Sequence, residues 1–367
     1  MRDQPTSRAR RSALGLLPVP FLLLAAGAVQ DAPPPAVDTP LVELRFAVEP
    51  GTQLAKSWVV EHALVMNRMA MKIADGERQQ LDVRSIIQSQ LQLELVDRYD
   101  ALEGGRPASM RRAYDTARLV GTLKLQQFAD QPPKVADMRS PLEGKSVVFT
   151  WVPEEQEYGR YYDALEGEEE HLPALAPDTD LGRLLPAAPV RVGETWKVEA
   201  QALRDVIAPA GTLHFKAGKS FDRLLGRALT AGVGGGLEQA FGGESDGGVT
   251  LVLEGLEERD GAQVARISLA VRAKYGKDQT DFSRENMARR EEERGARFIS
   301  NHLVLELDGK GELLWDLRAG HALQLELDLR ESVSMRIVEE QEGTGVRLEQ
   351  EMEMSGRLKQ QLLVAAQ

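Results

Sequence analysis

The chain has 367 residues, of which 42% are hydrophobic and 28% charged, with a formal net charge of −12. This composition is typical of a globular protein with a sizeable core and excludes general disorder. The absence of cysteine excludes disulfides, thiolate metal sites and a cysteine nucleophile, and the acidic balance argues against nucleic acid and anionic lipid headgroups as partners.

Residues 1–28 have the pattern of an export signal. A basic start is followed by an apolar stretch from Ala13 to Ala26, and Ala26-Gly27-Ala28 fits a small-residue cleavage site. We therefore predict a signal peptide and an exported protein, located in the periplasm or outside the cell. A retained membrane helix is the alternative, but the stretch is short and contains Pro18 and Pro20. The segment carries four Arg and one Asp, a net +3, so the chain without it carries −15.

Residues 41–162 are predicted to form a strand-rich first half, after a proline-rich linker at 29–40. Within Leu81 to Ala101, apolar and polar residues alternate with a period of two, which is typical of a half-buried strand. The other predicted strands of this half are 41–48, 58–73, 118–128, 147–152 and 158–162.

Residues 163–189 interrupt this pattern with an acidic run and several prolines, and we predict a connector between two halves here. The second half, 190–367, starts with a strand over 190–198 in which Trp196 is expected to be a buried anchor. A short helix is expected at 221–229, and a charged helix or loop at 281–297.

Two hairpins are predicted in the second half. The first joins strands 247–256 and 262–275 across Asp260-Gly261, a dipeptide that favours tight hairpin turns. The second joins strands 298–307 and 313–319 across the glycines of 308–311.

The last quarter of the chain carries the strongest strand signal. From Leu323 to Ile337, apolar residues occupy the odd positions except for Glu331, and polar residues occupy the even ones. A helix would spread these leucines around its circumference, whereas a strand places them on one face. Residues 346–362 repeat the pattern after a turn at 339–345. We predict an all-β fold with few short helices, in which long antiparallel strands form a large open barrel or sandwich in two halves.

The segment from Leu184 to Trp196, read with Pro141-Leu142-Glu143-Gly144, resembles exported β-rich bacterial proteins of unassigned function. Those proteins carry an LP-x-x-PV-x-VG-(D/E)-x-W element after a strand-rich first half. The resemblance covers about twenty residues and implies no catalytic residues. It implies that Pro186 and Pro189 shape the crossing into the second half and that Trp196 fills the core.

Short matches to catalytic or metal-binding motifs lack the required context. Ser245 lies in a G-x-S-x-G match, but no helix is predicted after it. Gly218-Lys219-Ser220 lacks the upstream glycine of a phosphate-binding loop. The five histidines show no zinc-site spacing, and the acidic run at 166–170 lacks a calcium-loop pattern. We therefore predict no catalytic residues, no metal site and no cofactor, with an uncharacterised hydrolase as the third interpretation.

The apolar face of the last strands has two interpretations. It packs into a closed core, or it lines a concave surface that binds a lipid or another apolar ligand, since methionine adapts to varied apolar shapes. The leading hypothesis is such a non-enzymatic binding protein, which does not span the membrane once its signal is removed. The competing hypothesis is a structural or protein-binding envelope component that pairs through long edge strands. The predicted ligand-binding residues are Leu323, Leu325, Leu327, Leu329, Met335, Leu348, Met352 and Met354.

Overall fold

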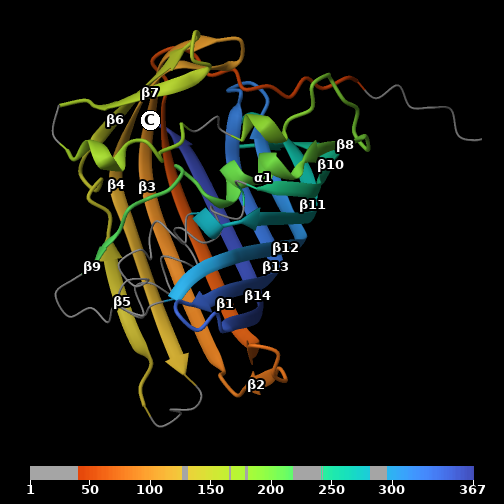
Figure 1. The fold of residues 1–367 in the computed structure, drawn as a ribbon. Helices are drawn as coiled ribbons and strands as arrows, with labels where there is room; N and C mark the ends of the chain where they lie inside the picture. Colours follow the sequence, from red (N-terminus) through yellow and green to blue (C-terminus); the bar gives the residue numbers. More distant parts are fainter. Residues whose placement is uncertain are drawn as a thin grey trace, which may run out of the picture. The chain divides into compact units, whose positions relative to one another are not determined.

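Most of the chain is built into one antiparallel sheet (Figure 1). The computed structural model describes residues 40–125, 131–164, 167–177, 181–217, 241, 243–281 and 296–367. Contacts divide the chain into residues 1–38 and 39–367, and all strands of the sheet belong to the second unit. Within the described part, no helix is long and apolar enough to cross a membrane.

The predicted β-dominated fold is confirmed, with 14 strands in the sheet formed by the described residues. The α-helix α1, with eight residues, and two short 3₁₀ turns at 169–171 and 182–184 accompany these strands in the described ranges. The elements are β1 Gln53–Ile73, β2 Gln79–Leu81, β3 Ser85–Glu103, β4 Arg106–Leu125, β5 Lys134–Arg139, β6 Ser146–Val152, β7 Glu157–Tyr162, β8 Thr195–Glu199, α1 Ala200–Ile207, β9 Lys216–Ala217, β10 Glu244–Arg259, β11 Ala262–Asp278, β12 Ala296–Asp316, β13 His321–Gln341 and β14 Arg347–Ala366.

The two predicted halves of the chain contribute to the same sheet. Its main path runs β7-β6-β4-β3-β1-β14-β13-β12-β11-β10-β8, so β1 of the first half pairs with the last strand, β14. This pairing extends from Leu54 opposite Ala366 to Ile73 opposite Leu348. The sheet is not closed, because β7 and β8 end the path. The first and last strands of the fold therefore lie at the centre of the sheet.

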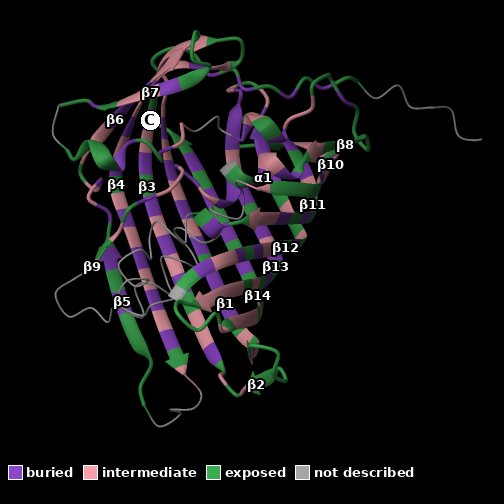
Figure 2. Cartoon of the chain, in the orientation of Figure 1, coloured by how far each residue is buried: buried purple, intermediate pink, exposed green. Residues whose placement is uncertain are grey.

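Side chains alternate between a buried inner face and an outer polar face along the long strands (Figure 2). On β13, Leu325, Leu327 and Leu329 are buried, while Glu326 and Arg330 on the opposite face are exposed. The period-two pattern predicted this directly, because successive side chains of a strand point to opposite sides.

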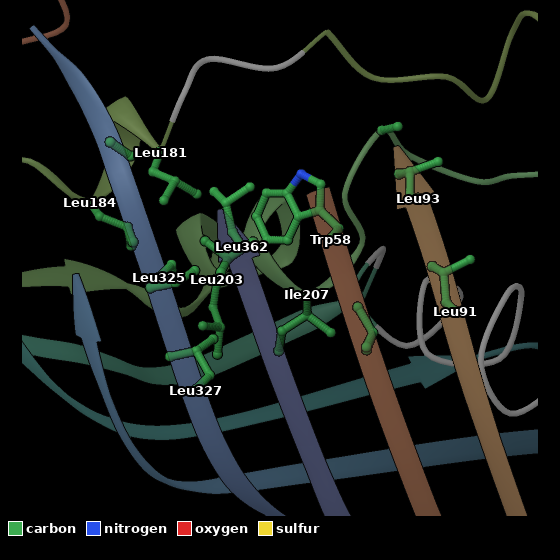
Figure 3. Close-up of a cluster of buried hydrophobic side chains, with 14 of the residues drawn as sticks. Trp58, Leu91, Leu93, Leu181, Leu184, Leu203, Ile207, Leu325, Leu327 and Leu362 are labelled. Carbon is green, nitrogen blue, oxygen red and sulfur yellow. The ribbon is translucent and has the colours of Figure 1, made fainter. Parts of the chain in front are cut away.

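Helix α1 covers part of the inner face, and the sequence analysis did not predict it. Leu203 and Ile207 pack in a cluster with Leu325, Leu327 and Leu362 of the sheet (Figure 3). The amide of Gln360 on β14 donates a hydrogen bond to the Val206 carbonyl at the end of the helix. With eight residues, α1 is too short to stand out by periodicity, so packing against the sheet is what stabilises it.

The predicted hairpin across 308–311 is wrong, because β12 runs without interruption from Ala296 to Asp316. Gly309 and Gly311 lie opposite Leu329 and Leu327 of β13. A Cβ added at Gly309 would lie 2.3 Å from the Asp328 carbonyl oxygen, and one at Gly311 would lie 2.4 Å from that of Glu326. These glycines therefore allow close approach of two strands and do not form a turn.

Other predicted elements need correction or lie outside the described residues. Residues 41–48 are buried at alternate positions, but only Val42 forms a bridge, to Val190. Trp196 is half-buried rather than fully buried, and its indole N–H donates a 2.8 Å hydrogen bond to the Leu184 carbonyl. The Asp260-Gly261 hairpin is confirmed, with both residues at positive φ. The predicted helix at 221–229, most of 281–297 and Gly218-Lys219-Ser220 lie outside the description.

Cross-strand ion pairs on the outer face should make stability depend on pH. The Arg357 guanidinium on β14 donates two hydrogen bonds to the Asp328 carboxylate on β13, and these lower the pKa of this carboxyl below its usual 3.8. The pair therefore stabilises the native state above pH 3.8, and this contribution is lost as pH falls through the lower native pKa. In urea unfolding, the difference between wild type and Asp328→Asn should be constant near neutral pH and disappear in strong acid. A difference that grows on acidification would contradict this.

Candidate functional site

The residues on the inner face of the central strands change from fully buried and apolar at one end to polar and half-buried at the other. At one level, α1 and the connector cover it, and Trp58, Leu325 and Leu327 are buried (Figure 3). Helix α1 ends at Ile207, beside Gln360. Past the level of Gln360, the inner positions of β1, β13 and β14 include polar residues and then methionines. Two sets of residues in this second part define the candidate site.

A group of methionines lies across the three central strands β1, β14 and β13. Met352 of β14 lies opposite Met69 of β1 and Met335 of β13, and the neighbouring Met354 lies opposite Met66. Directly paired residues of an antiparallel sheet point to the same side, so these five side chains share the inner face. All five are half-buried, in contrast to the fully buried leucines of β13. We call these five residues the methionine face.

Three buried polar residues border the methionine face. His62 Nδ1 of β1 lies 3.3 Å from Glu331 Oε1 of β13, and Ser89 of β3 lies directly opposite His62. They are only 4%, 2% and 6% exposed, respectively. Ser89 Oγ and Glu331 Oε2 make no hydrogen bond to any described residue. An unsatisfied buried polar atom costs about 1–3 kcal/mol, so this group favours a polar ligand atom as partner. We call these residues the polar layer.

The eight residues predicted to bind a ligand fall into separate groups. Leu325, Leu327 and Leu329 belong to the buried core. Leu323 lies at a bulge, since its neighbours Ala322 and Gln324 pair with consecutive residues of β12. The half-buried residues of the second part are Met335, Leu348, Met352 and Met354.

The sequence analysis missed the polar layer, although it contained a signal. Glu331 is the single acidic residue in the apolar odd-numbered series of β13. His62 lies between Val60 and Leu64, which are also on the inner face. A polar residue that interrupts the apolar side of a long strand must find a partner across the sheet or a ligand. Which partner it finds depends on strand pairing, which the sequence alone did not reveal.

A second buried polar cluster is held together by internal contacts. The Arg112 guanidinium donates 2.7 and 2.9 Å hydrogen bonds to the two carboxylate oxygens of Asp97. Lys56 Nζ lies 3.3 Å from the same carboxylate and donates to the Tyr99 hydroxyl at 2.9 Å. Burial raises the pKa of the neighbouring Tyr114 to about 12. These contacts join β1, β3 and β4, so we assign this cluster a structural role.

One group of side chains has the donors of a metal site. The metal-binding atoms of Glu168, Glu170 and His171 lie within 4.8 Å of one another, and the His214 ring centroid is 4.9 Å from that of His171. Lys216 Nζ, however, lies 3.0 Å from Glu168 Oε2, so an ammonium group already balances this carboxylate. This charge balance removes the main reason for a cation here.

Ser245, from the G-x-S-x-G match, is an exposed residue of strand β10, opposite Tyr275 of β11. Strand β10 continues from this serine to Arg259, where the nucleophile elbow would require a helix. Its position is therefore that of an ordinary strand residue on the sheet surface.

Comparisons with known proteins identify no family. No protein-family model and no curated protein matches the chain. A similar solved structure is the COG4313 outer membrane channel from Pseudomonas putida F1, with 8% identity, 87% of this chain and 97% of that chain covered, and a TM-score of 0.23. Lipovitellin has 8% identity, with 88% of this chain and 26% of that chain covered, and a TM-score of 0.26. A DUF1329 family protein from Desulfovibrio piger ATCC 29098 has 8% identity, with 80% and 83% covered, and a TM-score of 0.10.

At these TM-scores the similarities support no assignment of family or function. The resemblance of residues 184–196 to exported β-rich proteins likewise has no supporting family match. The fold therefore defines the class only as a protein built on one long-stranded, open antiparallel sheet.

Proposed function

We propose that this protein binds an apolar small molecule of the fatty-acyl class along the methionine face and that it has no enzymatic activity. The observation that carries the proposal is the half-buried methionine face beside the polar layer. Ligand sites combine a mostly apolar lining with a few placed polar groups, and this arrangement has both. Methionine side chains suit a ligand of variable shape because they are flexible and polarizable.

The acyl chain would lie on the methionines and its polar end would reach Ser89 and Glu331. A chain of about 14 carbons would gain on the order of 10 kcal/mol at about 0.8 kcal/mol per buried CH₂. After an association cost of at least about 4 kcal/mol, micromolar affinity is expected. Export to the periplasm or the outside of the cell is part of this proposal and rests on the predicted signal at residues 1–28.

The alternative of a protein-binding component that pairs through long edge strands has less support. The two strands that end the sheet's main path are short: β7 has six residues and β8 has five. A short edge offers few free main-chain groups for pairing with another chain.

Titration with a fluorescent fatty-acid analogue tests the proposal. Wild type should bind the probe saturably with micromolar affinity, and Met335→Gln should weaken it about tenfold, since a polar amide replaces an apolar contact. Ser334→Gln is the matched control, because Ser334 is the adjacent residue of β13 and is exposed on the opposite face. No saturable binding, or equal effects of the two variants, would refute the proposal.

The polar end of the ligand can be tested separately. Ser89→Ala should weaken binding of a free fatty acid more than binding of the alkane of the same chain length, because only the acid has a polar end that accepts a hydrogen bond from the serine hydroxyl. An equal loss for both ligands would show that Ser89 does not contact the polar end.

A further inference from the structure

A cleft of about 870 Å³ lies where five parts of the chain meet. They are residues 44–46, the turn between β3 and β4, the β6–β7 hairpin (Figure 1), residues 176–177 and residues 182–187. The last part includes Leu185-Pro186-Ala187 from the motif of the sequence analysis. The volume is in the range of small-molecule sites. We call it the arginine cleft, after the four arginines in its lining, which are Arg45, Arg106, Arg160 and Arg183. The lining also contains the aromatic residues Phe46, Trp151 and Tyr158 and the acidic residue Glu157.

Two of these arginines are held in place by uncharged groups. The guanidinium carbon of Arg106 lies 3.7 Å from the centre of the Trp151 ring. Trp151 in turn packs edge-on against Tyr158, with 5.1 Å between ring centroids. Arg160 donates through Nε to the Leu175 carbonyl at 2.7 Å and through Nη1 to the Tyr158 carbonyl at 2.8 Å. These contacts leave Nη2 of Arg160 and the in-plane N–H groups of Arg106 to donate elsewhere.

The charges of Arg106 and Arg160 are not balanced locally. In the described part of the chain, no carboxylate lies within ion-pairing distance of either guanidinium, although both are half-buried. Burial raises the pKa of Tyr158, and the charges of Arg106 and Arg183 act against this rise. A cationic cleft in a chain of net charge −12 is an attractive site for small anions.

We propose that the arginine cleft binds a small polyanion that carries phosphate or carboxylate groups. Guanidinium groups match both oxyanions, since their parallel N–H groups donate two hydrogen bonds at once. The arginines come from separate segments of the cleft wall, so a ligand with two or more anionic groups satisfies several of them together. This site is independent of the methionine face, and neither proposal requires the other.

Calorimetric titration of the full chain with pyrophosphate and, separately, with citrate tests the proposal and distinguishes the two ligand chemistries. We expect saturable binding of at least one of them, weakened by added salt because charges form the contact. Arg160→Gln and Arg106→Gln should each weaken binding about tenfold, the effect of losing one charge-assisted hydrogen bond. Retention of the wild-type melting temperature would show that the variants are folded.

Two further variants keep the test decisive if Arg160→Gln does not fold. Arg45 is 68% exposed, so Arg45→Gln should leave the fold intact and still weaken binding. Arg330→Gln on β13 is the control, because this exposed arginine lies outside the cleft and should leave affinity unchanged. The proposal is overturned if neither anion binds, if the control weakens binding as much as the cleft variants, or if only an acidic peptide such as hexaglutamate binds.

Discussion

Replacing Asp97 by alanine should be among the most destabilising single changes in this protein, at about 3–5 kcal/mol. The Asp97 carboxylate receives two hydrogen bonds from Arg112 and lies 3.3 Å from Lys56 Nζ, and all three side chains are fully buried. Without it, both cations lose the carboxylate that they share in a buried site. The free energy of unfolding, from urea titration at neutral pH, measures the effect.

Asp137→Ala provides a matched control for this prediction. Asp137 also receives two hydrogen bonds from an arginine of β4, Arg118, at 2.8 and 2.6 Å. Both of these side chains are exposed, so solvent replaces the lost contacts and the change in unfolding free energy should be a small fraction of that at Asp97. Equal losses for Asp97→Ala and Asp137→Ala would show that burial does not determine the importance of these ion pairs.

Two alanine variants on one strand should separate the core from the proposed binding face. Leu327 is 3% exposed and belongs to the cluster that α1 covers, so Leu327→Ala should cost about 2–5 kcal/mol through lost burial and a cavity. Met335 points to the same side of β13 but is half-buried. Met335→Ala should therefore cost less in stability, measured by the same urea titration.

The same two variants should act in the opposite order on ligand binding. Met335→Ala should weaken binding of the fatty-acid analogue, while Leu327→Ala, under conditions where it is folded, should bind it like wild type. Should Leu327→Ala weaken binding more than Met335→Ala, the ligand would occupy the part of the inner face covered by α1, and the methionine face would not be the site.

Alternation along the chain predicted the strands and their buried sides. In β13, Leu325, Leu327 and Leu329 are buried as predicted, because direction within a strand depends on backbone geometry and position parity. The Asp260-Gly261 turn was also predictable, since both residues adopt positive φ and few other dipeptides do so readily. These features depend only on residues close together in sequence.

Tertiary structure decided what local patterns left open. Gly309 and Gly311 are typical of a turn by themselves, but Leu329 and Leu327 of the neighbouring strand lie against them, so they are part of a continuous β12. Helix α1 likewise exists because the sheet offers a surface for Leu203 and Ile207.

Sequence alone therefore determined that this is a protein of long antiparallel strands with one apolar side. Only the tertiary structure brought His62 to Glu331, 269 residues away, and gathered arginines from separate segments around one cleft. The physical reason is that the alternation of side chains between the two faces of a strand depends only on residues adjacent in sequence. Binding groups, in contrast, are assembled by pairing between strands and by loop packing, whose register no local pattern encodes.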